Sequence, residues 1–428
     1  MMTRRNFIQT AGLGVAAIGT SSFMPNILTG FSSSVSADAK TKPSSKVLVC
    51  LFQRGAADGL NIVVPFTERS YYDLRPTLAI PEPKSGNPKA AINLDGKFGF
   101  HPTLAPLKPY FDNGQLAVIH AAGSPDATRS HFDAQDYMES GTPGRKSTTD
   151  GWLNRYLAAS VEPGDTPFRG VALTQLTPRS MQGSADVVAM ANIGSFNLRA
   201  GSNSSVKSSF EEMYAQSATD ALRGTGHDTF DAVNFLRKAN PEQFKVENGA
   251  DYPRGPLGNS LRQIAQLIKA GVGLEVAFAE MGGWDTHNNQ GDPGNGQGVG
   301  QLSRLLREFG GSLAAFAQDL GPRMQDVVVL TMTEFGRTAR QNGTGGTDHG
   351  HASCMFVLGG PVKGGKVYGQ WPGLGTNDLY EGRDLAVTTD FRDVVAEVLT
   401  RHMGARNLRS VLPGYTVNEK NFRGILKA

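Results

Sequence analysis

Carboxylate and imidazole side chains gather in one stretch towards the end of this 428-residue sequence. The run Val327 to Leu330 is apolar and rich in β-branched residues, which predicts a strand buried on both faces, and Glu334 stands where that strand should end. A glycine-rich loop then brings Asp348, His349 and His351 within four positions. Zinc, manganese and iron prefer this mixture of ligands, so we expect a metal site here. The simpler alternative is an N-capping aspartate beside solvated loop histidines.

A second pair of a carboxylate and an imidazole follows another predicted strand. The apolar run Leu274 to Ala279 leads to two glycines, and Asp285 and His287 come directly after them. Open α/β sheets bind their ligands at the carboxyl ends of the strands. We therefore expect Asp285 and His287 to face the same site as Glu334.

Asp58 is a further candidate ligand, because it lies beyond the first predicted strand, Val47 to Phe52. Gly55 and Gly59 flank it and allow another group to approach the backbone closely. Taken alone, however, this motif fits an ordinary Asp-Gly turn better. Asp58 is considered a metal ligand only because the other clusters supply ligands of the same kind.

Ser130 is the candidate nucleophile. It stands between the predicted strand Leu116 to Ala121 and a predicted helix, so its hydroxyl should lie at a helix N-terminus. Free N–H groups there favour negative charge, and an adjacent metal ion would activate the hydroxyl. Arg129 and His131 would then lie beside the developing oxyanion. The alternative role for Ser130 is a plain helix N-cap. His120, inside the strand, is interpreted as a hydrogen-bonded core histidine.

Strands alternate with helical stripes along the chain, as at Leu257 to Ile268 and Leu302 to Phe316. This alternation predicts a three-layer α/β/α sandwich with a mostly parallel central sheet. We expect one domain over residues 47–428, with an inserted cap or substrate region at about 142–256, where the strong pattern is lost. The carboxyl edge of the sheet should gather the candidate ligands and nucleophile, namely Asp58, Ser130, Asp285, His287, Glu334, Asp348, His349 and His351.

Composition narrows the class of protein. Charged residues make up 19% of the chain and the 52 glycines are abundant, which fits a loop-rich α/β enzyme. The formal net charge of +3 gives no electrostatic footprint for nucleic acid or for acidic membranes. The two cysteines, Cys50 and Cys354, lie in apolar runs and are interpreted as buried free thiols, although a disulfide would form if their strands were neighbours.

The N-terminus has the pattern of a twin-arginine export signal. Arg4 and Arg5 precede the mildly apolar run Ala11 to Ile18, and no acidic residue occurs before Asp38. We expect a signal peptide over residues 1–37, a linker over 38–46, passage through the twin-arginine translocase, and a periplasmic or exported protein. The apolar run is too short to be a stable membrane anchor. Because this route exports folded proteins, it favours one that takes up a metal ion beforehand.

Several motifs together resemble the exported bacterial family of domain of unknown function 1501. The motifs are RGAADGLN, RSHFDAQDYMESG, GGWDTH, TEFGRTARQNGTGGTDHGH and TTDFRDVVAEVL. That family is more distantly similar to the superfamily of alkaline phosphatases, sulfatases and phosphopentomutases, which implies an alkaline-phosphatase-like fold and two divalent ions. Carried over, the resemblance places Asp58, Ser130 and Glu334 on one ion. It places Asp285, His287 and either His349 or His351 on the other.

These observations support a metal-dependent hydrolase or transferase that acts on phosphate or sulfate esters of small molecules or glycans. Ser130 would be the nucleophile, Arg129, His131 and Arg337 would lie nearest the substrate anion, and the ions would be zinc, manganese, magnesium or calcium. The alternative is an exported, non-catalytic binding or assembly protein that keeps the fold. A redox protein has little support, because the sequence has no cysteine cluster, haem motif or nucleotide fingerprint.

Overall fold

The computed structural model describes residues 46–84, 86–146, 148–160, 166–195, 234–291 and 300–427. The expected signal peptide, the linker up to residue 45 and positions 196–233 of the expected cap lie outside the described residues. Within the part that is described, no helix combines the length and the apolar character needed to cross a membrane.

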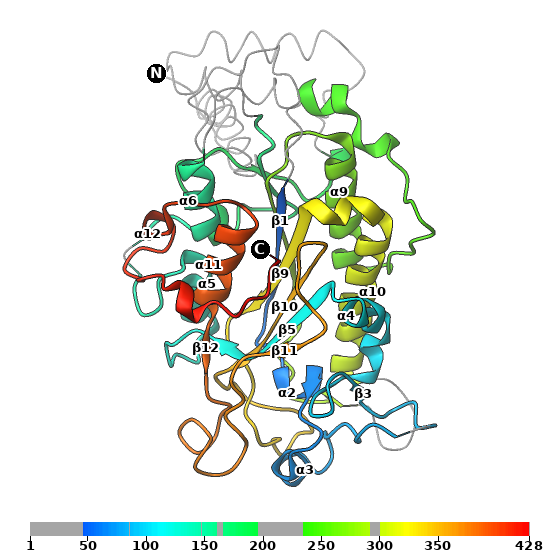
Figure 1. Cartoon of the computed structure of the whole chain (residues 1–428), viewed down its shortest axis with the longest axis vertical. Helices are drawn as coiled ribbons and strands as arrows, with labels where there is room; N and C mark the ends of the chain where they lie inside the picture. The colour runs from blue at the N-terminus through cyan, green and yellow to red at the C-terminus, as the bar shows by residue number, and fades with distance from the viewer. Residues whose placement is uncertain are drawn as a thin grey trace, which may run out of the picture.

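A central sheet organises the described chain (Figure 1). Its strands follow the order β11-β5-β10-β9-β1-β8-β6-β7, and β12 also pairs with β5. The strands of this sheet are β1 (Val47–Gln53), β5 (Leu116–Gly123), β6 (Gly170–Ala172), β7 (Val188–Ala189), β8 (Val276–Met281), β9 (Val327–Thr333), β10 (Ser353–Gly359), β11 (Val367–Tyr368) and β12 (Thr389–Asp390). A second, small sheet has the order β2-β4-β3, from β2 (Val63–Val64), β3 (Ile92–Asn93) and β4 (Gly99–Phe100).

The central sheet is parallel except for one strand. β1 runs parallel to both β8 and β9, β6 runs parallel to β8 and β7, and only β10 is antiparallel to its neighbours β9 and β5. The carboxyl ends of β1, β8 and β9 therefore lie at one edge of the sheet, and β10 begins at that same edge. The predicted α/β architecture with a mostly parallel sheet is confirmed.

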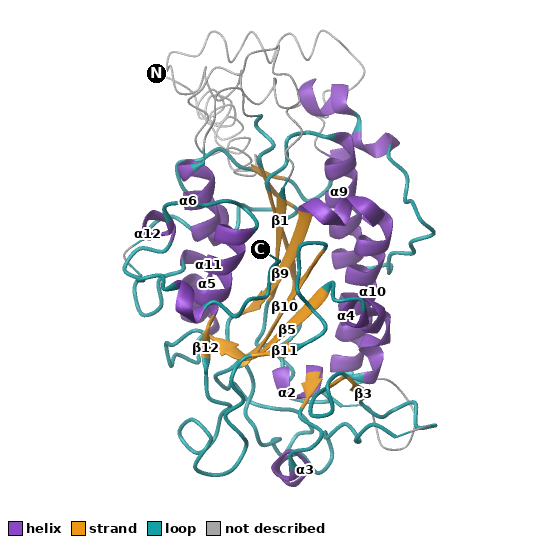
Figure 2. Cartoon of the chain, viewed as in Figure 1, coloured by secondary structure: helices purple, strands orange, loops and turns teal. Residues whose placement is uncertain are grey.

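Helices cover both faces of the sheet (Figure 2). One layer contains α5 (His131–Ser140), α6 (Trp152–Ala159), α11 (Phe391–Arg401) and α12 (Leu408–Val411). The other contains α4 (Lys108–Asp112), α9 (Pro256–Ala270), α10 (Gln301–Leu320) and the 3-10 helix η1 (Pro102–Leu107). Shorter helices among the described residues include α2 (Gly59–Ile62), α3 (Arg69–Leu74), η2 (Arg179–Met181), η3 (Ile193–Ser195), η4 (Pro241–Gln243), η5 (Gly321–Asp326) and η6 (Glu419–Asn421).

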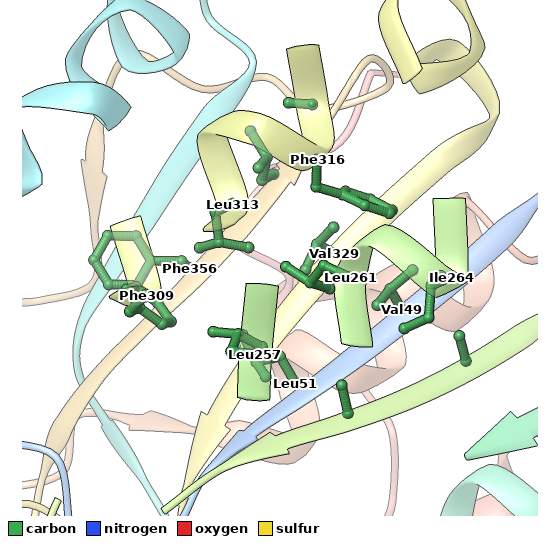
Figure 3. Packing of buried hydrophobic residues seen from close by; sticks show 14 of the residues in the cluster. Val49, Leu51, Leu257, Leu261, Ile264, Phe309, Leu313, Phe316, Val329 and Phe356 are labelled. Carbon is green, nitrogen blue, oxygen red and sulfur yellow. The ribbon is translucent and has the colours of Figure 1, made fainter. Parts of the chain in front are cut away.

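Both faces of the central strands are apolar, because each face meets a helical layer. In β1, Val49 and Leu51 pack against α9 and α10, and Figure 3 shows them beneath Leu257, Leu261 and Ile264 of α9. The alternate residues of β1 pack against the α5, α6 and α11 layer. This explains the unbroken apolar run in the sequence, which a sheet with one wet face would not need.

The two cysteines lie on opposite faces of the sheet. Cys50 of β1 belongs to the core beside α5 and α6, whereas Cys354 of β10 belongs to the core beside α10. Both are buried free thiols, as interpreted from the sequence, and burial raises the pKa of each.

His120 is a core residue, as interpreted from the sequence. Its Nε2 donates to the Val63 carbonyl at 2.8 Å, and its Nδ1 accepts from the Ala121 N–H at 2.8 Å. Burial lowers its pKa to about 4, so the ring is neutral near pH 7.

The region expected as an inserted cap contributes to the central sheet. Its strands β6 and β7 extend the sheet beyond β8, and α6 packs in one of the two helical layers. The described parts of residues 142–195 are thus continuous with the main core.

Candidate metal site

Three histidines and an aspartate meet at the carboxyl edge of the sheet. His131 is the first residue of α5, Asp285 and His287 follow β8, and His349 lies in the loop between β9 and β10. Neighbouring strands that end at one edge bring together residues that are up to 218 positions apart, as for His131 and His349.

The imidazoles approach one another through their Nε2 atoms. His349 Nε2 lies 3.0 Å from His131 Nε2 and 3.1 Å from His287 Nε2. Asp285 Oδ1 is 3.1 Å from Nε2 of both His287 and His349, and Asp285 Oδ2 is 3.5 Å from His131 Nε2. Among the described residues, His131, Asp285 and His349 form the group whose ligand atoms all lie within 4.8 Å of one another.

The other ring nitrogen of each histidine faces an acceptor. His131 Nδ1 lies 2.8 Å from Glu334 Oε1, His287 Nδ1 lies 2.9 Å from Asp348 Oδ1, and His349 Nδ1 lies 2.9 Å from the Arg129 carbonyl oxygen. A carbonyl or carboxylate oxygen only accepts, so each Nδ1 carries the proton and donates it. In a neutral ring this leaves a lone pair on Nε2.

Three Nε2 atoms therefore point into one small space beside Asp285, whose Oδ1 accepts a hydrogen bond from His349 Nε2 whenever that nitrogen carries a proton. Two lone pairs at about 3 Å repel one another unless a proton or a cation lies between them. Metal-bound histidines show the same pattern, with one nitrogen on the ion and the other donating to a carboxylate or a carbonyl. The cluster has the chemistry of a metal site with its supporting hydrogen bonds already formed.

Glu334 orients His131 rather than facing the cluster. Its Oε1 accepts from His131 Nδ1, from Gln135 Nε2 at 2.9 Å and from the Gly55 N–H at 2.8 Å. Burial favours the protonated carboxyl, but these hydrogen bonds outweigh it and lower the pKa of Glu334. In turn, the hydrogen bond to Glu334 raises the pKa of His131.

Asp348 has the same role for His287. It accepts from His287 Nδ1 and also from Asn342 Nδ2 at 3.2 Å. The hydrogen bond from His287 lowers the pKa of Asp348. Both Glu334 and Asp348 were expected from the sequence as direct ligands, and the structure places each behind a histidine.

The cluster is negatively charged and reachable from solvent. Asp285, Glu334 and Asp348 contribute carboxylates, and Arg337 Nη1 lies 2.9 Å from Asp285 Oδ1, which leaves a net charge of two negative units with neutral histidines. The side chains of Asp285 and His287 are 44% and 41% exposed. A divalent cation would balance this charge.

Asp58, a candidate ligand in the sequence, lies apart from the histidines. Its carboxylate forms a bidentate ion pair with Arg75 at 2.6 and 2.9 Å, and both side chains are buried. Gln290 Nε2 also donates to Asp58. These partners occupy the carboxylate with bonds that hold segments of the fold together.

Ser130, Arg129 and His351 are likewise bound to other partners. The Ser130 hydroxyl caps α5 by accepting from the Asp133 N–H at 3.5 Å, and the Arg129 guanidinium pairs with Asp384 and with Glu381. His351 Nε2 lies 3.1 Å from the Ser124 carbonyl, and its ring packs against Tyr380. Between His349 and His351, it is His349 that joins the cluster.

The sequence indicated no role for Gln135, and it indicated Gly55 only as a glycine that flanks Asp58. Gln135 follows His131 by one helical turn, so both side chains reach Glu334 from the same face of α5. The available signal was this spacing of four, in a helix that follows the predicted strand after a short loop. His131 was expected near the substrate anion, and the structure places it among the ligand atoms.

A family model described as "Protein of unknown function (DUF1501)" matches residues 45–413 of the chain. The chain belongs to this family. The cluster and the strands that position it all lie within the matched residues. No curated protein matches the chain.

Two solved structures share a distant likeness with this DUF1501 protein. The lipoteichoic acid synthase LtaP from Listeria monocytogenes aligns with 10% identity and a TM-score of 0.33, over 77% of this chain and 69% of that one. An alkaline phosphatase from the Antarctic bacterium TAB5 aligns with 11% identity and a TM-score of 0.29, over 75% of this chain and 93% of that one.

Proposed function

We propose that this DUF1501 protein binds a divalent transition-metal ion and uses it to hydrolyse phosphate or sulfate esters of small molecules or glycans. The observation that carries the proposal is the convergence of the Nε2 atoms of His131, His349 and His287 beside the Asp285 carboxylate. Imidazole nitrogen with one carboxylate suits zinc, manganese or iron, whereas magnesium and calcium prefer oxygen ligands. Zinc is therefore the first choice.

The ion would be held by His131, Asp285 and His349. Three protein ligands leave a coordination position open, and a zinc ion so held lowers the pKa of a bound water and polarises an ester oxygen. Ser130 directly precedes His131 and remains the candidate nucleophile, in competition with that water.

His287 decides between this proposal and a second candidate function. Its Nε2 lies 3.1 Å from both Asp285 Oδ1 and His349 Nε2, so it is placed to become a fourth ligand. Four protein ligands are typical of structural metal sites. A closed site would favour an exported binding or assembly protein stabilised by the ion.

Metal analysis of the full chain with matched histidine variants tests the proposal. We expect about one zinc or other transition-metal ion per protein chain. The His131→Ala variant should lose this ion. The control variant His351→Gln should retain it, although His351 is only two positions from His349. In protein that holds cobalt in place of zinc, His287→Ala should leave the amount of bound cobalt unchanged if His287 is not a ligand of the ion. Absence of bound metal in the unaltered protein would overturn the proposal.

Turnover separates the two candidate functions. We expect hydrolysis of p-nitrophenyl phosphate, bis-p-nitrophenyl phosphate or p-nitrophenyl sulfate by the metal-loaded protein and none after chelation. Ser130→Ala should abolish this activity if the serine is the nucleophile, and should preserve it if water attacks. A tightly held ion without turnover on any ester would favour the binding or assembly protein.

We also propose export through the twin-arginine translocase. Arg4 and Arg5 motivate this proposal. Cell fractionation should place the protein outside the cytoplasm, and substitution of both residues by lysine should leave it in the cytoplasm. Equal distribution of the two forms would contradict the proposal.

A further inference from the structure

Arg337 is a buried cation beside the candidate metal site that has few acceptors. Its side chain is fully buried, and Nη1 lies 2.9 Å from Asp285 Oδ1. Apart from this ion pair, Nε and Nη2 of Arg337 have no hydrogen-bond acceptor among the described residues. Asp285 therefore pairs with Nη1 of Arg337 but leaves the N–H groups of Nε and Nη2 without an acceptor.

A second buried arginine of this fold shows what a structural role requires. Arg75 is equally buried, yet its nitrogens donate to both Asp58 oxygens, to Asn61 Oδ1 and to the carbonyls of Thr338 and Ala339. Leaving N–H groups of a buried guanidinium unmatched is costly. Such a cost is tolerated where a ligand completes the hydrogen bonds.

The position of Arg337 links it to the metal site. Asp285 lies between the guanidinium and the histidines, with Oδ1 near Arg337 Nη1 and near Nε2 of His287 and His349. A metal ion bound to the Asp285 carboxylate would weaken the ion pair between Asp285 and Arg337. The side chain of Asp285 is 44% exposed and that of Arg337 is 0% exposed, so the ion pair joins a carboxylate that solvent reaches to a buried guanidinium.

We propose that Arg337 binds the phosphate or sulfate group of the substrate once the metal ion has engaged Asp285. This inference rests on the proposed function and names the residue that recognises its substrate class. The planar guanidinium fork matches two oxygens of a tetrahedral oxyanion. The site would then bind metal and oxyanion cooperatively, because the ion takes the charge of Asp285 and the oxyanion balances the charge of Arg337. This coupling is reciprocal, so each ligand strengthens the binding of the other.

Calorimetric titration of the full chain with inorganic phosphate and with sulfate tests the inference, in metal-free and zinc-loaded forms. We expect at least tenfold tighter anion binding to the loaded form. Arg337→Lys should weaken that binding by about ten- to hundredfold, because lysine lacks the bidentate fork, and Arg337→Gln should weaken it further. Arg340→Gln removes an exposed arginine three residues away and should change it by less than threefold. The phosphate and sulfate arms distinguish the two ester classes.

Metal content is measured on the same samples. Retained metal with lost anion binding supports the inference. Loss of metal in Arg337→Lys would overturn it and make Arg337 a positioning residue of Asp285. Equal anion binding by the variants and the unaltered protein would overturn it, as would a zinc-loaded protein that binds neither anion at 10 mM. In the last two cases the metal site of the proposed function would still stand.

Discussion

Each histidine of the cluster is oriented by a different kind of acceptor. Glu334 is buried and accepts from His131, Asp348 is half-exposed and accepts from His287, and a backbone carbonyl accepts from His349. A buried carboxylate holds an imidazole more firmly than an exposed one, because solvent competes less for its hydrogen bonds. Glu334 should therefore contribute most to the affinity for the ion.

Substitution Glu334→Gln tests this role. The amide oxygen can still accept from His131, but the charge that strengthens the bond is lost. We expect the dissociation constant for zinc, measured by competition with a chromogenic chelator, to rise by roughly 10- to 100-fold. Glu280→Gln is the control, since Glu280 pairs with Arg54 and contacts no histidine of the cluster. Equal effects of both substitutions would contradict the assignment.

Asp58 has a structural role at the same scale. Asp58→Asn leaves the buried Arg75 without its charge partner, so we expect the free energy of unfolding in urea to fall by roughly 3–5 kcal/mol. Metal content should stay unchanged. The double variant Asp58→Asn with Arg75→Gln removes the uncompensated charge and should be more stable than the single one. Loss of the ion from a folded Asp58 variant would restore Asp58 as a ligand.

At the scale of elements, the loop between β9 and β10 carries both Asp348 and His349. The backbone of this loop packs directly against the backbone of His287 and of Arg337. A Cβ atom on Gly346 would overlap the carbonyl group of His287, and one on Gly350 would overlap the backbone of Arg337. Arg337 and His349 also pair as a short antiparallel bridge. Glycine thus allows the loop to reach the segment after β8 and to place His349 beside His287.

Gly346→Ala and Gly343→Ala form a matched pair within this loop. We expect Gly346→Ala to lose most metal binding and to lower stability by roughly 1–3 kcal/mol, because the new methyl group forces the loop away from His287. A Cβ on Gly343 meets nothing within 4 Å, so that variant should behave as the unaltered protein in metal analysis and urea unfolding. Similar results for both would show that the close approach is not required.

At the scale of the whole molecule, the sheet acts as a platform for segments from distant parts of the chain. β1, β8 and β9 end at one edge, β10 begins there, and α5 starts beside them. An ion bound by His131, Asp285 and His349 would join α5 to the loops that follow β8 and β9. An ion that binds the folded chain and not the unfolded chain stabilises the folded state by mass action.

Metal removal should therefore destabilise the entire chain. With free zinc at about a thousand times the dissociation constant, we expect a gain of roughly 4 kcal/mol in the free energy of unfolding over the chelated protein. Thermal unfolding followed by circular dichroism measures the change. His131→Ala should unfold at the same temperature with and without zinc, and magnesium should not replace zinc. A zinc-dependent shift of equal size in that variant would place the ion elsewhere.

The sequence by itself determined the architecture and the general location of the site. Unbroken apolar runs such as Val47 to Phe52 and Val327 to Leu330 predict strands buried on both faces, because adjacent residues of a strand point to opposite faces of the sheet. The polar residues that follow those strands mark the carboxyl edge. His349, Asp285 and His287 were all named on this basis, and the structure brings them together.

Only the tertiary structure decided which residues face the cluster and which support it. Glu334, Asp348 and Asp58 carry the same chemical group, and the sequence interpreted all three as ligands. Their roles differ because of their partners: His131 and His287 for the first two, and Arg75 for the third. A hydrogen bond depends on tenths of an ångström between segments far apart in the chain, and residue type and spacing do not encode those distances.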